Sequence, residues 1–126
     1  MIALLVLACA TGADTGGDDA PATLYRVQAE VFTPSCAFSS CHGGPNGSAG
    51  LDLTEGASHA AIVGVSARDP ANGALVMPGD HAASYLWRKC AGDADIAGDP
   101  MPNADGLDAE RLPLLAEWID AGALDD

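Results

Sequence analysis

Hydrophobic and polar residues alternate with a helical period in only a few short stretches of this 126-residue chain, and the first is residues 24–32. Apolar residues recur there every three or four positions, the spacing that places them on one face of a helix; they are Leu24, Val27, Val31 and Phe32. The intervening Arg26, Gln28 and Glu30 are expected to face outward. Pro34 lacks a backbone donor and is expected to end the helix.

Two further stretches in the middle of the chain predict short helices. Residues 59–65 have a helical pattern that is broken at Gly64. Residues 84–89 follow the turn sequence Pro-Gly-Asp, and Asp80 is a candidate cap for the start of that helix. We therefore expect two helices of one to two turns here.

The last helix is predicted from Asp108, a suitable N-terminal cap, to about Ala121, with Gly122 placed to close it. Its apolar face is expected to consist of Leu112, Leu115, Trp118 and Ile119. Pro113 falls within the first turns, so either one backbone hydrogen bond is lost or the regular helix begins slightly later.

The remaining segments predict loops rather than strands. Residues 43–47 are rich in Gly and Pro, residues 51–53 alternate like a short extended piece, and residues 92–102 are irregular. The expected fold class is therefore all-α, with short helices joined by long Gly/Pro-rich loops. Such long loops in so small a domain need something to organise around.

The chain begins with a short apolar run, residues 1–8, which is followed by Cys9. This resembles a bacterial lipoprotein signal, in which the signal peptide is removed and Cys9 is lipidated as the new N-terminus. Residues 11–21 have too little apolar surface to offset the entropy of ordering them. We therefore expect residues 9–23 to be a lipid-anchored flexible linker and residues 24–126 to be one exported domain, periplasmic or at the cell surface. So short an apolar run cannot span a bilayer.

Eighteen acidic residues against five basic ones give the chain a formal net charge of -13. Nucleic acid and anionic membrane surfaces would repel such a protein, whereas a partner protein with a basic patch would be attracted to it. Solubility alone is an equally good explanation of the charge. The acidic pairs at residues 93 and 95 and at residues 125 and 126 are expected to be solvated, because no calcium-binding pattern is present.

The most informative segment is residues 32–44, FTPSCAFSSCHGG. Cys41 and His42 match the end of a haem-attachment motif, in which two thiols bond the porphyrin and the adjacent His ligates the iron. Two residues normally separate the two cysteines. Here four residues separate Cys36 from Cys41, and Phe38 occupies the usual place of the first cysteine.

Three arrangements of the cysteines are compatible with this spacing. In the first, both Cys36 and Cys41 bond the haem. In the second, only Cys41 is attached and Cys36 forms a disulfide with Cys90. Cysteine parity favours the second, because lipidation of Cys9 leaves three thiols in an oxidising compartment. In the third, no haem is bound and the cysteines only cross-link loops.

Five short motifs follow one another along the domain. They are CHGG at 41–44, GLDL at 50–53, PGD at 78–80 followed by SYL at 84–86, MP at 101–102 and EWIDAGA at 117–123. In this order and spacing, the domain resembles the small cytochrome c-like domains of exported bacterial lipoproteins. The resemblance implies an all-helical fold whose first and last helices cross. It also implies one haem c, with His and Met as the two iron ligands. The wider cysteine spacing departs from the family's pattern.

Met101 is the best candidate for the sixth iron ligand. It lies in the loop sequence GDPMP, where no regular element dictates its direction and the flanking prolines would hold the loop stiff. A thioether favours ferrous iron and suits an electron carrier. Met77, which also precedes a proline, is the second candidate, and His59 and His81 are expected to be surface residues. An open sixth position, which would suit a sensor or peroxidase, is the alternative.

The sequence thus predicts a single-haem electron-transfer protein and not an enzyme. The haem would be held by Cys36, Cys41, His42 and Met101, with redox proteins as partners and the lipid anchor as the only membrane contact. Trp87, Trp118 and Tyr85 are expected to be core residues that could also edge the haem. The opposing hypothesis is a haem-free, disulfide-stapled surface module that binds a partner.

Overall fold

The first helix of the structure consists of three consecutive segments and runs from Leu24 to Ser35. The computed structural model describes residues 20–126. In it α1 spans Leu24–Val27, the π-helical segment η1 spans Gln28–Phe32, and α2 spans Thr33–Ser35. The hydroxyl of Thr23 caps the start by accepting a hydrogen bond from Arg26 N at 3.2 Å. The helix therefore passes Pro34 and ends one residue later.

Gln28 is the one residue of this helix that the sequence analysis placed wrongly. It was expected to face outward, but it is buried. The reason is its position, four residues after Leu24 and four before Phe32, which puts it on the apolar face of the helix. Its amide compensates for burial by donating to the carbonyl oxygen of Leu53 at 2.9 Å and by accepting from the Ser58 hydroxyl at 2.6 Å.

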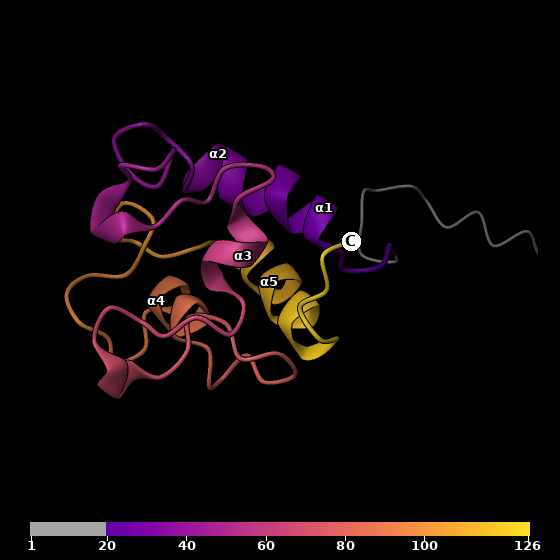
Figure 1. The fold of residues 1–126 in the computed structure, drawn as a ribbon. Helices are drawn as coiled ribbons and strands as arrows, with labels where there is room; N and C mark the ends of the chain where they lie inside the picture. The colour runs from indigo at the N-terminus through magenta and orange to yellow at the C-terminus, as the bar shows by residue number, and fades with distance from the viewer. Residues whose placement is uncertain (1–19) are drawn as a thin grey trace, which may run out of the picture.

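Three more helices complete the fold among the described residues. They are α3 at Ser58–Ile62, α4 at Tyr85–Ala91 and α5 at Arg111–Asp120. Two single 3-10 turns, η2 at Ser48–Gly50 and η3 at Pro70–Asn72, lie in the loops between them. The described part of the chain is thus a small all-α fold of four short helices without a β-sheet, as the sequence predicts (Figure 1).

The ends of α4 and α5 differ in part from the prediction. Asp80 does not cap α4: its carboxylate accepts from Ala83 N, and Ser84 occupies the capping position. The regular helix α5 begins at Arg111, later than the predicted start at Asp108, and Glu110 occupies the N-cap position. Asp108 Oδ1 still accepts a hydrogen bond from Arg111 N at 2.9 Å. Pro113 lies in the first turn of α5, where its missing donor costs no helical hydrogen bond.

The core is formed where α5 packs against the first helix and against α4 (Figure 1). Its largest fully buried side chains include Phe32 from the first helix and Trp118, Leu115 and Ile119 from α5. Leu114 is buried as well, and Leu112, which is predicted to lie on that face, is partly buried and packs against the core. The expected contact between the first and last helices is therefore present.

A loop between α3 and α4 is tied to both helices by backbone hydrogen bonds. It contains two isolated bridges, Val63 with Val76 and Ser66 with Ala74. The first residues of α4 continue this pairing, because Tyr85 N donates to the carbonyl oxygen of Ala74 at 3.0 Å. These hydrogen bonds hold the end of the loop against the start of α4.

The C-terminal residue returns to the beginning of the first helix (Figure 1). Leu24 N donates a hydrogen bond to Asp126 Oδ1 at 3.0 Å. Among residues 20–126, no helix combines the length and the hydropathy needed to cross a bilayer. The predicted signal peptide, the predicted lipidation site Cys9 and the linker up to residue 19 lie outside the described residues.

Candidate functional site

A cavity of about 360 Å³ brings together the sequence-predicted site residues. Its lining includes Cys36, Cys41 and His42 from the segment after the first helix, Cys90 from α4, and Met101 from the loop before α5. Most of the other lining residues are apolar, among them Leu51, Leu53, Ala61, Val65, Leu75 and Leu86. We call this space the thiol cavity. Its volume is within the range of roughly 300–1,000 Å³ found for small-molecule and cofactor sites.

The segment that carries Cys36, Cys41 and His42 is a closed backbone loop. His42 N donates to the carbonyl oxygen of Cys36 at 3.0 Å, and this hydrogen bond brings the two ends of the segment together. Gly43 is required beside them, because a Cβ at that position would lie 2.4 Å from the Phe38 backbone. The four-residue spacing is thus accommodated as a bulged turn that leaves both thiols in the cavity lining.

His42 is held by its backbone on both sides, while its ring lacks a partner. Leu53 N donates to the carbonyl oxygen of His42 at 2.8 Å, and Ser48 N donates to that of Cys41 at 2.7 Å. Within residues 20–126, the buried Nδ1 of His42 has no hydrogen-bond partner. Trp87 Nε1 and Arg88 Nε are also buried without a partner among these residues, but neither residue lines a described cavity. It is the combination of an unpaired ring nitrogen with a place in the lining of the thiol cavity that makes His42 a candidate ligand-binding residue.

The three cysteines of the described residues are free thiols. Desolvation by burial raises the pKa of Cys36 from 9.0 to about 11, although the nearby Arg111 opposes this shift. Burial likewise raises the pKa of Cys90 to about 12, and the neighbouring Cys36 adds to that shift. Both thiols are protonated at neutral pH and are poor nucleophiles without an activating partner. Cys36 and Cys90 line the same cavity, and their pairing in a disulfide stays a prediction.

The two candidate methionines are equally exposed but lie in different places. Met101 is 44% exposed and lines the thiol cavity, where its backbone N donates to the carbonyl oxygen of Lys89 at 3.0 Å. Met77 is 45% exposed and does not line the cavity. The structure therefore brings Met101, and not Met77, into the same lining as His42.

His59 and His81 also lie outside the thiol cavity. The Nε2 atom of His59 is 2.9 Å from the carbonyl oxygen of Ala123. The Nδ1 atom of His81 is 2.8 Å from a carboxylate oxygen of Asp120, and its ring packs edge-on against Trp87. Both histidines are half-buried, and both contact the C-terminal part of the chain.

Arg68 and Lys89 line the thiol cavity, and the sequence analysis assigned neither residue to the site. Lys89 lies on α4 one residue before Cys90, and adjacent residues of a helix lie about 100° apart around its axis, so the helical period does not predict that Lys89 shares a site with that thiol. Arg68 belongs to the loop between α3 and α4, and no sequence pattern predicts where that loop folds. Of the aromatic residues expected to edge the site, Tyr85 lines the cavity, whereas Trp87 and Trp118 do not.

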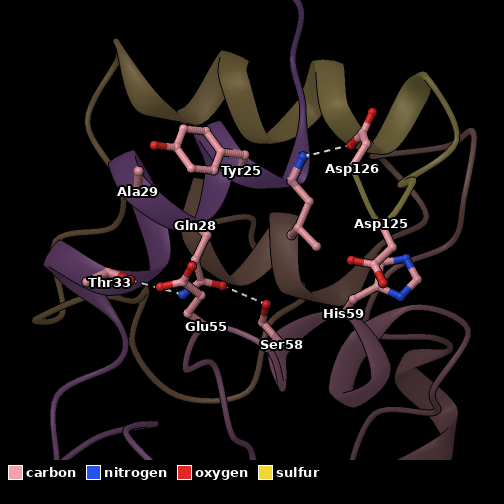
Figure 2. Close-up of a pocket in the computed structure, with 11 residues that line it drawn as sticks. Tyr25, Gln28, Ala29, Thr33, Glu55, Ser58, His59, Asp125 and Asp126 are labelled. Carbon is pink, nitrogen blue, oxygen red and sulfur yellow. Dashed lines mark hydrogen bonds between the residues drawn. The ribbon is translucent and has the colours of Figure 1, made fainter.

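A second cavity, of about 610 Å³, is lined by residues of the first helix, of α3 and the loop before it, and of the C-terminus (Figure 2). We call it the acidic cavity, because three carboxylates, Glu55, Asp125 and Asp126, belong to its lining. Gln28 forms hydrogen bonds there with Thr33 and Ser58 (Figure 2). The acidic cavity contains no cysteine or methionine, and it shares no lining residue with the thiol cavity.

The thiol cavity contains the two types of side chain that a haem iron takes from a protein. A porphyrin supplies four of the six iron ligands, so a protein that binds haem needs to add only two, and the lining includes one imidazole, that of His42, and one thioether, that of Met101. Among residues 20–126, no group of three or more His, Cys, Asp or Glu side chains is arranged to hold a metal ion. Comparisons of the chain with protein-family models, with curated proteins and with solved structures find no match.

Proposed function

We propose that this protein transfers electrons through one covalently bound haem c seated in the thiol cavity, with His42 and Met101 as the iron ligands. The observation that carries the proposal is the shared lining: Cys36, Cys41, His42 and Met101 border one apolar cavity, although as many as 65 positions separate them in the chain (36 to 101). If Met101 only filled the core and His42 only lay at the surface, nothing would predict that both residues border the same cavity.

The chain's own residues would perform three tasks. His42 would supply an imidazole whose Nδ1 forms no hydrogen bond with the described residues, and Met101 would supply a soft thioether that favours the ferrous state. The apolar residues of the lining would pack against the porphyrin and shield the iron ligands from water, which lowers the reorganisation that accompanies electron transfer. When bound, haem iron cycles between the ferric and ferrous states and so carries one electron.

The cysteines would fix the haem covalently. Each attached thiol adds across a vinyl double bond of the porphyrin: its sulfur bonds one carbon and its proton goes to the other, so no oxidant is consumed. Cys41, next to His42, takes part in both haem-binding arrangements. Cys36 distinguishes the two arrangements, because it forms a second thioether in the first and a disulfide with Cys90 in the second. Cys36, Cys41 and Cys90 all line the cavity.

The setting of this domain is part of the proposal. Lipidation at Cys9 would hold the protein at a membrane surface outside the cytoplasm, where cysteines oxidise and haem c is attached. The net charge of -13 would attract a redox partner that carries a basic patch. Solubility alone would account for the same charge, so the partner is the least constrained element.

The proposal is tested by spectroscopy on the full chain produced in a bacterium with a cytochrome maturation system. Pyridine haemochrome absorbance should show one haem c for each chain, and His42→Ala should abolish or shift the spectrum. His59→Ala is the matched control, because His59 lies outside the thiol cavity, and it should leave the spectrum unchanged. A colourless wild-type protein with paired thiols would instead support the haem-free binding module.

A further inference from the structure

The thiol cavity has an unusual charge for this protein. Its lining contains two cationic side chains, Arg68 and Lys89, and no Asp or Glu. The whole chain has only five basic residues against eighteen acidic ones. A random choice of charged residues would therefore have placed mostly carboxylates around the cavity, and their absence from this lining points to a function for the positive charge.

The remaining three basic residues are all paired with carboxylates. Arg26 pairs with Glu30 at 3.2 Å, Arg88 with Asp95 at 2.7 Å, and Arg111 with Asp108 at 2.8 Å. Within residues 20–126, neither Arg68 nor Lys89 takes part in an ion pair. The two cations without a carboxylate partner are thus the two that border the thiol cavity.

Lys89 is half-buried, and its ammonium group donates to a neutral acceptor, the carbonyl oxygen of Ala97, in an exposed contact. A carboxylate would bind this ammonium group more strongly than a neutral carbonyl oxygen does. Lys89 projects from the face of α4 that also brings Leu86 and Cys90 to the cavity.

Arg68 reaches the same cavity from a segment that is attached to α4. The loop that precedes α4 is bound to this helix by the hydrogen bond from Leu86 N to the carbonyl oxygen of Leu75, at 2.9 Å. Arg88 also donates from its guanidinium to the carbonyl oxygen of Asn72 at 2.7 Å. The loop that carries Arg68 and the helix that carries Lys89 therefore form one connected wall.

We propose that Arg68 and Lys89 bind the acidic groups of the ligand in the thiol cavity. This proposal rests on the proposed function, under which the acidic groups are the two propionate carboxylates of the porphyrin. The ligand would have an apolar body against the leucines and alanines of the lining and carboxylates at the cations. An uncharged ligand of the same shape would leave both cations without a partner. This assigns two positioning residues whose role does not depend on iron.

The test separates carboxylate recognition from iron ligation by using a porphyrin that contains no metal. The full chain, prepared without haem and with its thiols reduced, is titrated with protoporphyrin IX and with its dimethyl ester, and binding is followed by porphyrin fluorescence. The diacid should bind about tenfold or more tightly than the diester, since each exposed charge pair contributes up to about 1 kcal/mol. Added salt should weaken binding of the diacid only.

Charge-matched variants assign the effect to the two residues. Arg68→Gln and Lys89→Gln should each weaken binding of the diacid about threefold to fivefold and leave binding of the diester unchanged. Arg26→Gln is the control, because it removes the same charge from a residue outside the cavity, and it should bind like the wild type. Far-ultraviolet circular dichroism confirms that each variant folds.

Each outcome bears on a different statement. Equal binding of diacid and diester, or variants that behave like Arg26→Gln, would overturn the role of Arg68 and Lys89 while leaving a porphyrin site intact. If neither porphyrin binds, both the carboxylate site and the proposed function are contradicted. If the diacid alone binds but His42→Ala retains the haem spectrum, the carboxylate site stands and the iron ligation fails.

Discussion

The two cavities of this molecule differ in how completely their polar groups are paired. In the acidic cavity, the buried amide of Gln28 has partners for both its donor and its acceptor, and His59 meets the carbonyl oxygen of Ala123. In the thiol cavity, the buried Nδ1 of His42 has no hydrogen-bond partner, and Arg68 and Lys89 form no ion pair with a carboxylate, as far as the described part of the chain shows. A closed hydrogen-bond network stabilises a fold, whereas unpaired groups around an apolar space are typical of a ligand site.

The volumes of the two cavities point the other way, and the comparison shows why volume alone misleads. The acidic cavity is the larger, at about 610 Å³ against about 360 Å³. Its charged lining residues are carboxylates in a chain that is acidic throughout, so their presence there needs no special explanation. The thiol cavity is distinguished by the chemistry of its lining, which collects residues that are scarce in this sequence.

The largest expected effect on stability is at the closed network beside the acidic cavity. Gln28→Ala leaves the Ser58 hydroxyl and the Leu53 carbonyl oxygen unpaired and should lower the free energy of unfolding by about 3 kcal/mol. Urea denaturation of the haem-free full chain measures the change. Glu30→Ala, on the same helix but exposed, should change it by less than about 1 kcal/mol. Equal effects of the two variants would show that the network is not structural.

The next prediction concerns the thiol cavity and the ligand of the iron. Met101→Ala should lower the reduction potential of the matured protein by on the order of 100 mV, because loss of the thioether removes the donor that favours ferrous iron. Met77→Ala should leave the potential unchanged, since Met77 has the same exposure but lies outside the cavity. Protein-film voltammetry gives both values. A shift in Met77→Ala alone would reassign the ligand.

The sequence predicted the regular parts of this molecule better than its cavities. Helical spacing and a capping aspartate suffice to place α5, because both signals are local. The spacing of Gln28 from Leu24 and Phe32 also indicates its burial, but a polar side chain is normally expected to face outward. Met101 and His42 line the same cavity, whereas the ligation of iron by Met101 stays a prediction.

Arg68 and Lys89 could not have been assigned to the site in the same way. Their positions follow from long-range contacts between a loop and α4, such as the hydrogen bond from Leu86 N to the carbonyl oxygen of Leu75. No period or motif records such contacts. The wider spacing between Cys36 and Cys41 is a similar case, since only the folded turn shows that both thiols line one cavity.

A smaller effect is expected from pH on the haem-free, reduced chain. Burial raises the pKa of Cys36 to about 11 and of Cys90 to about 12, from 9.0. Their contribution to stability is complete below pH 9. Above pH 9 the unfolded chain loses these protons first, so stability falls as pH rises towards 11–12, by up to about 1.4 kcal/mol per pH unit for each thiol.

Urea denaturation at pH 8.5 and pH 10.5 measures this loss. Cys90→Ala removes one of the two thiols and should reduce the loss between the two pH values by about half. Other groups titrate in the same range, but they are common to both proteins, so the difference isolates Cys90. An identical pH dependence of the variant and the wild type would contradict the burial of this thiol.

The smallest expected effect is that of a substitution in the acidic cavity on the affinity for porphyrin. Glu55→Gln removes a carboxylate from the acidic cavity and should change the affinity for metal-free protoporphyrin IX by less than about twofold, because solvent and salt screen a charge outside the binding site. The fluorescence titration used for Arg68→Gln and Lys89→Gln measures it. A gain in affinity as large as the losses in those two variants would mean that the whole acidic surface, rather than the lining of the thiol cavity, sets the affinity.

The most direct test of a covalent haem in the thiol cavity is peptide mass mapping of the matured full chain. Proteolysis followed by mass spectrometry reports the state of Cys36, Cys41 and Cys90 separately. We expect the mass of a porphyrin on the peptide that contains Cys41 and His42, with Cys36 either joined to the same porphyrin or cross-linked to Cys90. A matured sample in which no peptide carries a porphyrin would contradict the account.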